Sequence, residues 1–260
     1  MINRPAGTSP LPRLREVLLP DLEGDLAVFP LHGALLLPRG RLPLNIFEPR
    51  YIAMIDDALR SRRLIGMLQP QGVEVDDEDD SDDEDEGDAI GQQSRFVLGR
   101  DSPIVRDMPP SLYQIGCAGR LSSFTEREDG TYAITLAGIA RFRVVRELEP
   151  VRGYRQVRPD FTAFAGDLTE PEAFPIDREA LLLALRRFFS QRGFEARWEA
   201  IEQMDDETLI ITLSMICPFA VAEKQALLEA PTLAQRAQTL LALLQMAGHE
   251  MDGGRKPHAI

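Results

Sequence analysis

The chain has few of the residue types from which reactive centres are built. Its 260 residues include two cysteines, three histidines and two lysines, Lys224 and Lys256. Cys117 and Cys217 lie a hundred positions apart, which excludes a disulfide framework or a four-cysteine zinc site within this chain and is typical of a reducing compartment. No histidine stands at metal-ligand spacing from another histidine or a cysteine. We therefore predict no bound metal, no cofactor and no catalytic residue.

Long apolar runs are also missing. The longest one, Ala180–Leu185, is far too short to cross a bilayer. Residues 1–25 are proline-rich and lack the apolar core of a signal peptide. We expect a cytoplasmic protein without a membrane segment, whose N-terminal extension over 1–25 is partly disordered.

Since the chain has only two lysines, arginine carries nearly all of the positive charge, and the negative charge is concentrated in one segment of the chain. The net charge is −13, but eleven acidic residues lie between Asp76 and Asp88, so the remainder carries only −2. We expect residues 71–93 to form a solvated acidic loop. An EF-hand is excluded because Gln93 occupies the twelfth loop position, where calcium needs a bidentate glutamate. The nearly neutral remainder has no electrostatic footprint for nucleic acid.

The composition that remains is that of an ordinary globular protein, with 44% hydrophobic and 27% charged residues. The densest pattern covers residues 29–51. Two apolar runs, Ala27–Leu31 and Leu42–Phe47, flank a turn at Pro38-Arg39-Gly40, which predicts a strand, a turn and a second strand in a hairpin. Pro49 suits the first position of a helix, whose apolar face carries Tyr51, Ile52, Ile55, Ala58 and Leu59.

Residues Leu112–Phe161 have the pattern of β-structure. Gly116 and Gly119 suggest bending or a bulge in the first strand, and Glu128–Thr131 is a turn before a returning strand. Gly138 is expected to end that run, and another strand follows over 140–145. Short strands separated by glycine turns predict a small, strongly bent sheet or barrel.

After a linker at Ala163–Pro175, the apolar residues recur with the period of a helix. Asp177 and Asp205 are predicted N-caps of two helices, and Gly193 and Pro218 are their predicted ends. A third helix is expected over Glu223–Glu229, and Thr232 with Gln235 forms a capping box for the last one. The single tryptophan, Trp198, is expected to be a core aromatic residue.

Several blocks of residues resemble one known family. They are F-P-L at 29–31, P at 38, R-L-P-L-N-I-F-E-P-R-Y at 41–51, I-G-C-A-G-R-L at 115–121, G-x-x-R-F-R-V at 138–144 and P-F-A-V-A-E-K-Q-A-L-L-E-A-P at 218–231. Together they resemble the N-terminal, substrate-binding domain of Lon proteases, a module that also occurs alone in small bacterial proteins and in cereblon-type proteins. The resemblance extends from about residue 26 to 246 and departs at the acidic insertion and around Arg95–Pro110.

The resemblance implies an α+β fold in which a PUA-like bent sheet or pseudo-barrel is followed by an α-helical bundle. The corresponding boundaries are an extension over 1–25, a β-rich subdomain over 26–162 with the acidic loop 71–93, a helical subdomain over 163–249, and a tail over 250–260. The ATPase and peptidase domains of Lon have no counterpart, because the sequence lacks a G-x-x-x-x-G-K-S/T loop and Pro218 separates Ser214 from Lys224 onto different helices. We expect Lys224 to be solvated near a helix start.

The implied function is non-catalytic, stand-alone binding of polypeptide, including exposed apolar segments of damaged or unfolded proteins, through a groove between the subdomains or an exposed sheet edge. The alternative is RNA binding through the PUA-like fold, and a third hypothesis is a hydrolase built on Ser214 and Lys224. Arg41, Arg143 and Arg146 are further candidates for carboxylate recognition. The motif at 41–51 has two interpretations, one in which it only encodes shape and one in which it contacts the ligand. The candidate binding residues are Arg41, Asn45, Phe47, Glu48, Arg50 and Tyr51.

Overall fold

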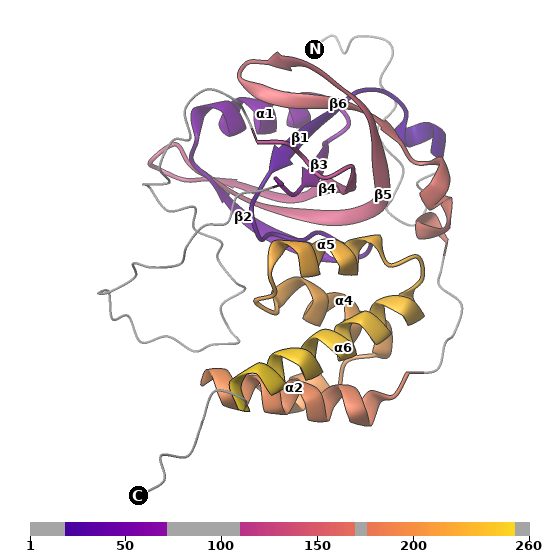
Figure 1. The fold of residues 1–260 in the computed structure, drawn as a ribbon. Coiled ribbons are helices and arrows are strands. Elements are labelled where there is room, and N and C mark those ends of the chain that lie inside the picture. The colour runs from indigo at the N-terminus through magenta and orange to yellow at the C-terminus, as the bar shows by residue number, and fades with distance from the viewer. Residues whose placement is uncertain (1–18, 72–109, 170–175, 253–260) are drawn as a thin grey trace, which may run out of the picture. The chain divides into compact units, whose positions relative to one another are not determined.

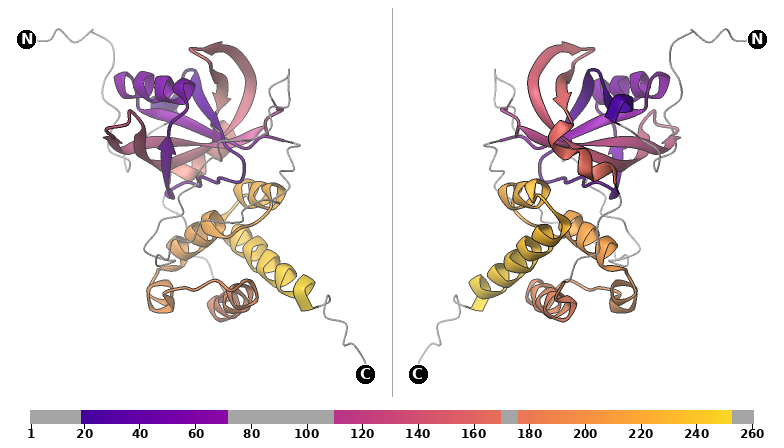
Figure 2. Two further views of the ribbon diagram at one scale, coloured as in Figure 1. Left: turned by 90° about the vertical axis from the view of Figure 1, so that its left-hand side faces the viewer. Right: turned by 90° about the vertical axis from the view of Figure 1, so that its right-hand side faces the viewer.

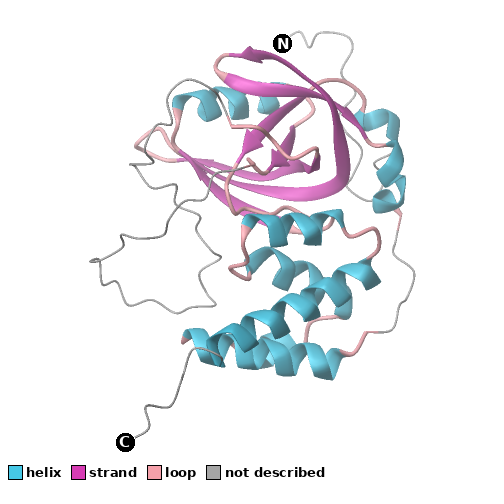
Figure 3. Ribbon diagram, in the orientation of Figure 1, coloured by secondary structure: helices cyan, strands magenta, loops and turns pink. Residues whose placement is uncertain are grey.

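The computed structural model describes residues 19–71, 110–169 and 176–252. Contacts divide these residues into two compact units, which are described separately: a β unit of residues 19–71 and 110–169, and a helical unit of residues 176–252. Figure 1 labels their elements and Figure 3 separates helices from strands by colour. The predicted acidic loop, except for Gln71 at its start, lies outside the described residues.

The β unit is built on one sheet of six strands. They are β1 (Leu26–Pro30), β2 (Arg41–Ile46), β3 (Leu64–Leu68), β4 (Ile115–Glu126), β5 (Tyr132–Val151) and β6 (Tyr154–Asp160). Their order is β2-β5-β4-β3-β1-β6, and β6 also pairs with β5. Since this last pairing joins two strands already linked through β4, β3 and β1, it closes the sheet into a barrel, which Figure 2 shows from two sides. The prediction of a bent sheet or barrel is correct.

The predicted hairpin between the first two strands is wrong. β1 pairs in parallel with β3 and antiparallel with β6, whereas β2 pairs with β5. The cause lies in the intervening segment, where Leu35, Leu36 and Leu37 are each at most 1% exposed. Their burial removes apolar surface from water, so this segment packs against β4 and β5, near Gly119 and Gly138, instead of forming a hairpin loop. The predicted turn itself is present, since Gly40 N donates to Leu37 O at 2.9 Å.

β5 is longer than the sequence pattern indicates, because Gly138 lies within the strand. A Cβ on Gly138 would overlap the backbone oxygen of Leu37. This glycine therefore allows another stretch of backbone to approach the strand. The predicted bulge in β4 is confirmed, since the β4–β5 register shifts between Ala118 and Gly119.

Helix α1 (Pro49–Arg60) begins where it was predicted, with Pro49 in its first turn and Glu48 at the N-cap. The Glu48 carbonyl accepts the first helical bonds from the N–H groups of Tyr51 and Ile52, both at 2.9 Å. The helix packs against β1 and β6. Its buried residues are Tyr51, Ala53, Met54, Ile55 and Ala58.

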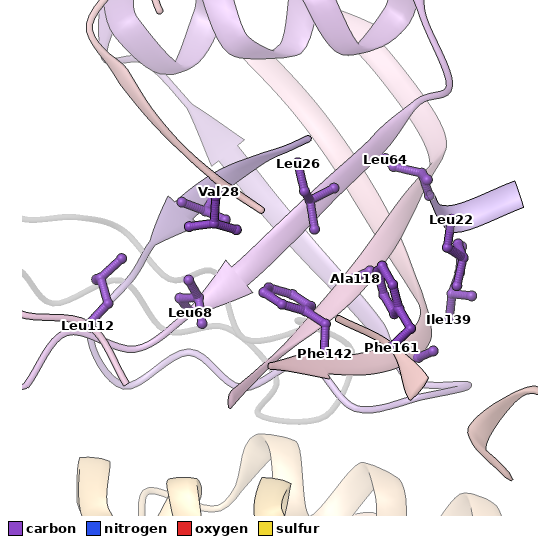
Figure 4. Packing of buried hydrophobic residues seen from close by; sticks show 12 residues of the cluster. Leu22, Leu26, Val28, Leu64, Leu68, Leu112, Ala118, Ile139, Phe142 and Phe161 are labelled. Carbon is purple, nitrogen blue, oxygen red and sulfur yellow. The ribbon is translucent and has the colours of Figure 1, made fainter. Parts of the chain in front are cut away.

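The core of the barrel is a cluster of apolar side chains from the 3-10 turn η2 (Leu19–Leu22), from every strand of the sheet except β2, and from the loops next to them (Figure 4). Leu22 belongs to it and is 1% exposed, although it precedes the first strand. The folded part thus begins before residue 26, where the N-terminal extension was predicted to end. The cluster consists of Leu22, Leu26, Val28, Leu64, Leu68, Leu112, Ala118, Ile139, Ala140, Phe142, Val157 and Phe161.

Part of the predicted linker at Ala163–Pro175 is an ordered element of the β unit. Residues Thr162–Leu168 form a 3-10 helix, η3, which packs on β5. Asp167 accepts hydrogen bonds from Arg141 Nε and Nη2 at 2.9 and 2.8 Å, and from the Arg141 backbone N–H at 2.9 Å. The side chains are 6% and 11% exposed. This buried ion pair holds η3 against β5. Composition alone had predicted a linker at these residues.

The helical unit contains α2 (Arg178–Arg192), α3 (Trp198–Glu202), α4 (Asp206–Ile216), α5 (Val221–Glu229) and α6 (Leu233–Asp252). Both predicted N-caps are confirmed, since Asp177 Oδ1 accepts from Ala180 N and Asp205 Oδ1 accepts from Thr208 N, each at 2.9 Å. Gly193 ends α2 in the left-handed region, with φ 70°. None of the helices in the described ranges combines the length and apolar character needed to cross a bilayer.

Two side chains of the helical unit differ from expectation. Trp198 is only half-buried, with its ring 5.8 Å from that of Phe189 and Arg186 stacked on it at 4.4 Å. Lys224 was expected to be solvated, but its side chain is 3% exposed, and burial lowers its pKa. The amphipathic pattern of a short helix does not reveal which of its polar residues will be covered.

Candidate functional site

β2 is the edge strand of the sheet in the β unit. It pairs with β5 on one side, and no described strand pairs with it on the other. β6, the strand at the opposite end of the order, is paired on both sides because it closes the barrel. Within the described residues, β2 therefore offers an open edge of the sheet to a further strand.

The register determines which backbone groups of β2 point to this open edge. Gly138 N donates to Gly40 O at 2.9 Å, just before the pair of Arg41 with Ala137. Because hydrogen-bonded and non-hydrogen-bonded pairs alternate along an antiparallel ladder, Leu42, Leu44 and Ile46 bond to β5. The residues whose backbone polar groups point away from β5 are Arg41, Pro43 and Asn45.

Pro43 lies at the centre of this edge. It has no N–H, so its position in a non-hydrogen-bonded pair costs the ladder with β5 nothing. Towards the open side, Arg41 and Asn45 each present an N–H and a C=O, and Pro43 presents only a C=O. At Arg41 and Asn45 the edge can therefore both donate and accept hydrogen bonds with another strand. At Pro43 it can only accept one.

Side chains on the exposed face of β2, or next to it, include three of the predicted site residues. Arg41 is exposed, and Asn45 is half-buried. The Asn45 amide oxygen accepts a 2.8 Å hydrogen bond from Arg127 Nη2, which comes from the turn between β4 and β5. Phe47, directly after the strand, is 37% exposed. The structure thus places Arg41 and Asn45 on the exposed face of β2, and Phe47 at the next alternate position, just beyond the end of the strand.

The other three predicted residues form a compact group at the end of β2. Arg50 Nη2 and Glu48 Oε2 form an ion pair at 2.7 Å, and the Arg50 guanidinium lies 4.6 Å from the centre of the Tyr51 ring. Tyr51 is 6% exposed, its ring is 4.2 Å from that of Phe29, and burial raises the pKa of its hydroxyl. The buried Tyr51 anchors the start of α1 to β1, next to the end of β2.

An exposed sheet edge was predicted from the sequence without being assigned to β2, and Arg127 was missed. Arg127 lies 82 positions from Asn45 in a polar turn, and no local pattern connects them. The sequence did contain an indication that β2 is an edge strand, because Pro43 lies inside the strand pattern and a proline there favours an edge strand. Arg143 and Arg146, the other candidates for carboxylate binding, lie on the part of β5 that pairs with β6. They are not brought together with Arg41.

Three features of the described residues bear on the metal and hydrolase hypotheses. No cluster of three or more histidine, cysteine, aspartate or glutamate side chains is found there that could hold a metal ion. Ser214 Oγ is buried without a hydrogen-bond partner among the described residues, so no base activates it there. Burial raises the pKa of the Cys217 thiol to about 12, which disfavours the nucleophilic thiolate.

Comparison with known proteins shows that nearly the whole chain matches one protein family. The family model of the ATP-dependent protease La (LON) substrate-binding domain matches residues 25–246. Lon protease 1 of Herpetosiphon aurantiacus is 23% identical over 241 residues, which cover 92% of this chain and 25% of the relative. Lon protease 2 of Myxococcus xanthus is 26% identical over 228 residues, which cover 86% of this chain and 24% of the relative. The chain thus spans about a quarter of the length of these relatives.

A solved structure shares the fold. The crystal structure of a Lon N-terminal domain protein from Xanthomonas campestris aligns with a TM-score of 0.50 and 21% sequence identity, over 84% of this chain and 98% of that chain. The predicted α+β class is correct. Since the family match extends over both units, the chain belongs to the family of ATP-dependent protease La (LON) substrate-binding domains.

Proposed function

We propose that this chain binds polypeptide segments in extended conformation along the open edge of β2, and that it carries out no chemical step itself. The observation that carries the proposal is the unpaired side of β2, with the backbone groups of Arg41, Pro43 and Asn45 directed outward. A peptide that adds a strand to a sheet edge gains its affinity from main-chain hydrogen bonds.

This mode of binding suits unfolded proteins. Main-chain bonds are available in every sequence, and each contributes about 0.5–1.5 kcal/mol net. An edge with few donors therefore binds many segments weakly, which fits a module that recognises the unfolded state of different proteins. Phe47 adds an exposed apolar surface beside the edge, where an apolar side chain of the segment would pack.

The six predicted residues then divide into two roles. Arg41 and Asn45 contact the segment from the exposed face of β2, and Phe47 contacts it from the position just beyond the strand. Glu48, Arg50 and Tyr51 are positioning residues, because the ion pair and the buried ring fix the junction between β2 and α1.

The test removes one backbone donor from the edge. In Asn45→Pro the outward N–H is lost, while the bonds of β2 to β5 involve only its neighbours. The matched control, Asn45→Ala, keeps the N–H and loses only the bond to Arg127. The probe is an array of peptides of about a dozen residues that tile a reduced, carboxymethylated protein, with the bound peptides re-measured by fluorescence anisotropy. Circular dichroism checks that both variants fold.

We expect Asn45→Pro to weaken binding about tenfold, since it loses a bond and adds a ring on the approach path, and Asn45→Ala to change it less than about threefold. Equal binding by both variants would exclude the edge as the binding site. Displacement of the peptides by single-stranded RNA, with an affinity that falls steeply as salt is added, would support RNA binding instead.

A further inference from the structure

The exposed face of β2 has different chemistry at its two ends. Arg41 begins the strand, is exposed, and forms no ion pair with any described residue. Phe47 follows the strand and is 37% exposed. One end therefore presents a cation without an ion pair among the described residues, and the other end presents an apolar ring. Six positions separate them, which is about 20 Å of extended chain.

The residues between these ends are uncharged, and a neighbouring cation, Arg127, is hydrogen-bonded to Asn45. Pro43 has no polar side chain, and the amide of Asn45 binds the guanidinium of Arg127. Arg127 also contributes to the lowered pKa of Asp129, whose carboxylate is chiefly stabilised by hydrogen bonds from Thr131. Arg41 is thus the position along this face where a carboxylate on an added strand gains the most.

An added strand would present alternate side chains to this same face. In the antiparallel orientation, which gives the slightly more stable pairing, the residue opposite Phe47 comes first and the residue opposite Arg41 follows six positions later. We infer that the β2 edge selects extended segments in which an apolar side chain precedes an aspartate or glutamate by six residues. This inference rests on the proposed function and adds sequence preference to it.

Pro43 argues against a second copy of this chain as the occupant. If two β2 strands paired antiparallel with their outward residues facing one another, Arg41 of each opposite Asn45 of the other, then Pro43 of each would lie opposite Pro43 of the other. Both outward carbonyls would then face a residue without an N–H, and the central bonds would be missing. A segment with an ordinary residue at this position donates its N–H to the Pro43 carbonyl, so the edge favours a different polypeptide.

The test uses synthetic peptides of about a dozen residues and a charge reversal on the full chain. The reference peptide carries leucine and, six residues later, aspartate in an otherwise serine and threonine background. The comparison peptides replace aspartate with lysine, replace leucine with serine, or exchange the positions of leucine and aspartate. The variant is Arg41→Glu, and the control is Arg146→Glu, which reverses an exposed arginine on the part of β5 that pairs with β6.

We expect the wild type to bind the reference peptide about fivefold tighter than the lysine peptide at low salt, with a smaller difference at high salt. Arg41→Glu should prefer the lysine peptide, and Arg146→Glu should behave as the wild type does. Phe47→Ala should weaken binding of the reference peptide about threefold and leave the serine peptide unchanged.

The outcomes separate this inference from the proposed function. If all peptides bind equally and all remain sensitive to Asn45→Pro, the edge binds without the proposed preference, and the inference fails alone. If no peptide binding depends on Asn45→Pro, both fail. If raising the protein concentration displaces the reference peptide while sedimentation shows a dimer, a second copy occupies the edge and the inference is overturned.

Discussion

The hydroxyl of Tyr154 donates a 3.0 Å hydrogen bond to Asp57 Oδ2, which joins the first residue of β6 to the last part of α1. Asp57 Oδ1 accepts a second bond from Arg152 Nη1 at 2.8 Å. The preceding residue, Asp56, accepts a 3.0 Å bond from the hydroxyl of Tyr132, the first residue of β5. Two adjacent carboxylates of α1 thus hold the starts of two strands of the barrel.

This contact predicts that stability falls at alkaline pH. Desolvation, aided by the bond to Asp57, raises the pKa of Tyr154 from 10.0 to about 12. Because the unfolded tyrosine ionises at lower pH than the folded one, the stabilisation is fully present below pH 10 and is lost as the pH rises towards 12. We expect about 2 kcal/mol of the free energy of unfolding to disappear over this range.

Urea unfolding of the wild type and of Tyr154→Phe across this pH range is the measurement. Tyr154→Phe should cost about 1 kcal/mol at neutral pH, because it removes one hydrogen bond, and should lose less stability than the wild type at high pH. The same dependence on pH in both proteins would show that Tyr154 is not responsible.

Gly138→Ala should damage the fold severely. A Cβ there would overlap the carbonyl of Leu37, and backbone cannot move aside as a flexible side chain can. We expect a loss of about 3 kcal/mol or more in the free energy of unfolding, measured by chemical denaturation. Gly166→Ala is the control, because no atom lies within 4 Å of its added Cβ. Comparable stability of the two variants would contradict the close approach at Gly138.

The buried pair of Arg141 and Asp167 predicts an asymmetry between single and double substitutions. Asp167→Ala leaves a buried guanidinium without its carboxylate and should cost about 3 kcal/mol. The double variant Arg141→Met with Asp167→Leu removes both charges and should be clearly more stable than the single variant. Thermal and urea unfolding of the three proteins give the comparison. A double variant that is less stable than Asp167→Ala would contradict this prediction.

Arg62 fastens the segment before β1. Its guanidinium donates to the carbonyl oxygens of Asp21, Glu23 and Asp25. Arg62→Ala should therefore raise the hydrogen-exchange rate of residues 19–25, measured by mass spectrometry, while the barrel strands keep their protection. Arg60→Ala, which alters a side chain that is 72% exposed, is the control. Equal exchange rates of residues 19–25 in the two variants would show that other contacts hold this segment.

Local signals predicted the helices well, and non-local pairing explains most of the errors. Asp177, Asp205 and Gly193 act within a few residues of their own position, so their roles can be read from the sequence. The partner of β2 lies about ninety residues further along the chain, and adjacent apolar runs falsely indicated a hairpin. Gly138 has the same appearance in the sequence whether it ends a strand or admits another backbone.

The candidate site was predicted in part. The motif at 41–51 covers β2 and the start of α1, but it did not separate exposed residues from buried ones. Tyr51 is covered because Phe29, over twenty positions away, packs on it. Pro43 belongs to this motif but was not among the candidate binding residues, although its missing N–H also identifies the side of β2 that remains open.

The most direct test of the central claim is amide hydrogen exchange of β2, measured residue by residue by NMR with and without a saturating peptide from the array. Addition of a strand at the open edge predicts that the N–H groups of Arg41 and Asn45 become protected about tenfold or more, while those of Leu42, Leu44 and Ile46, already bonded to β5, change little. Saturation with peptide while Arg41 and Asn45 exchange as fast as before would contradict the account.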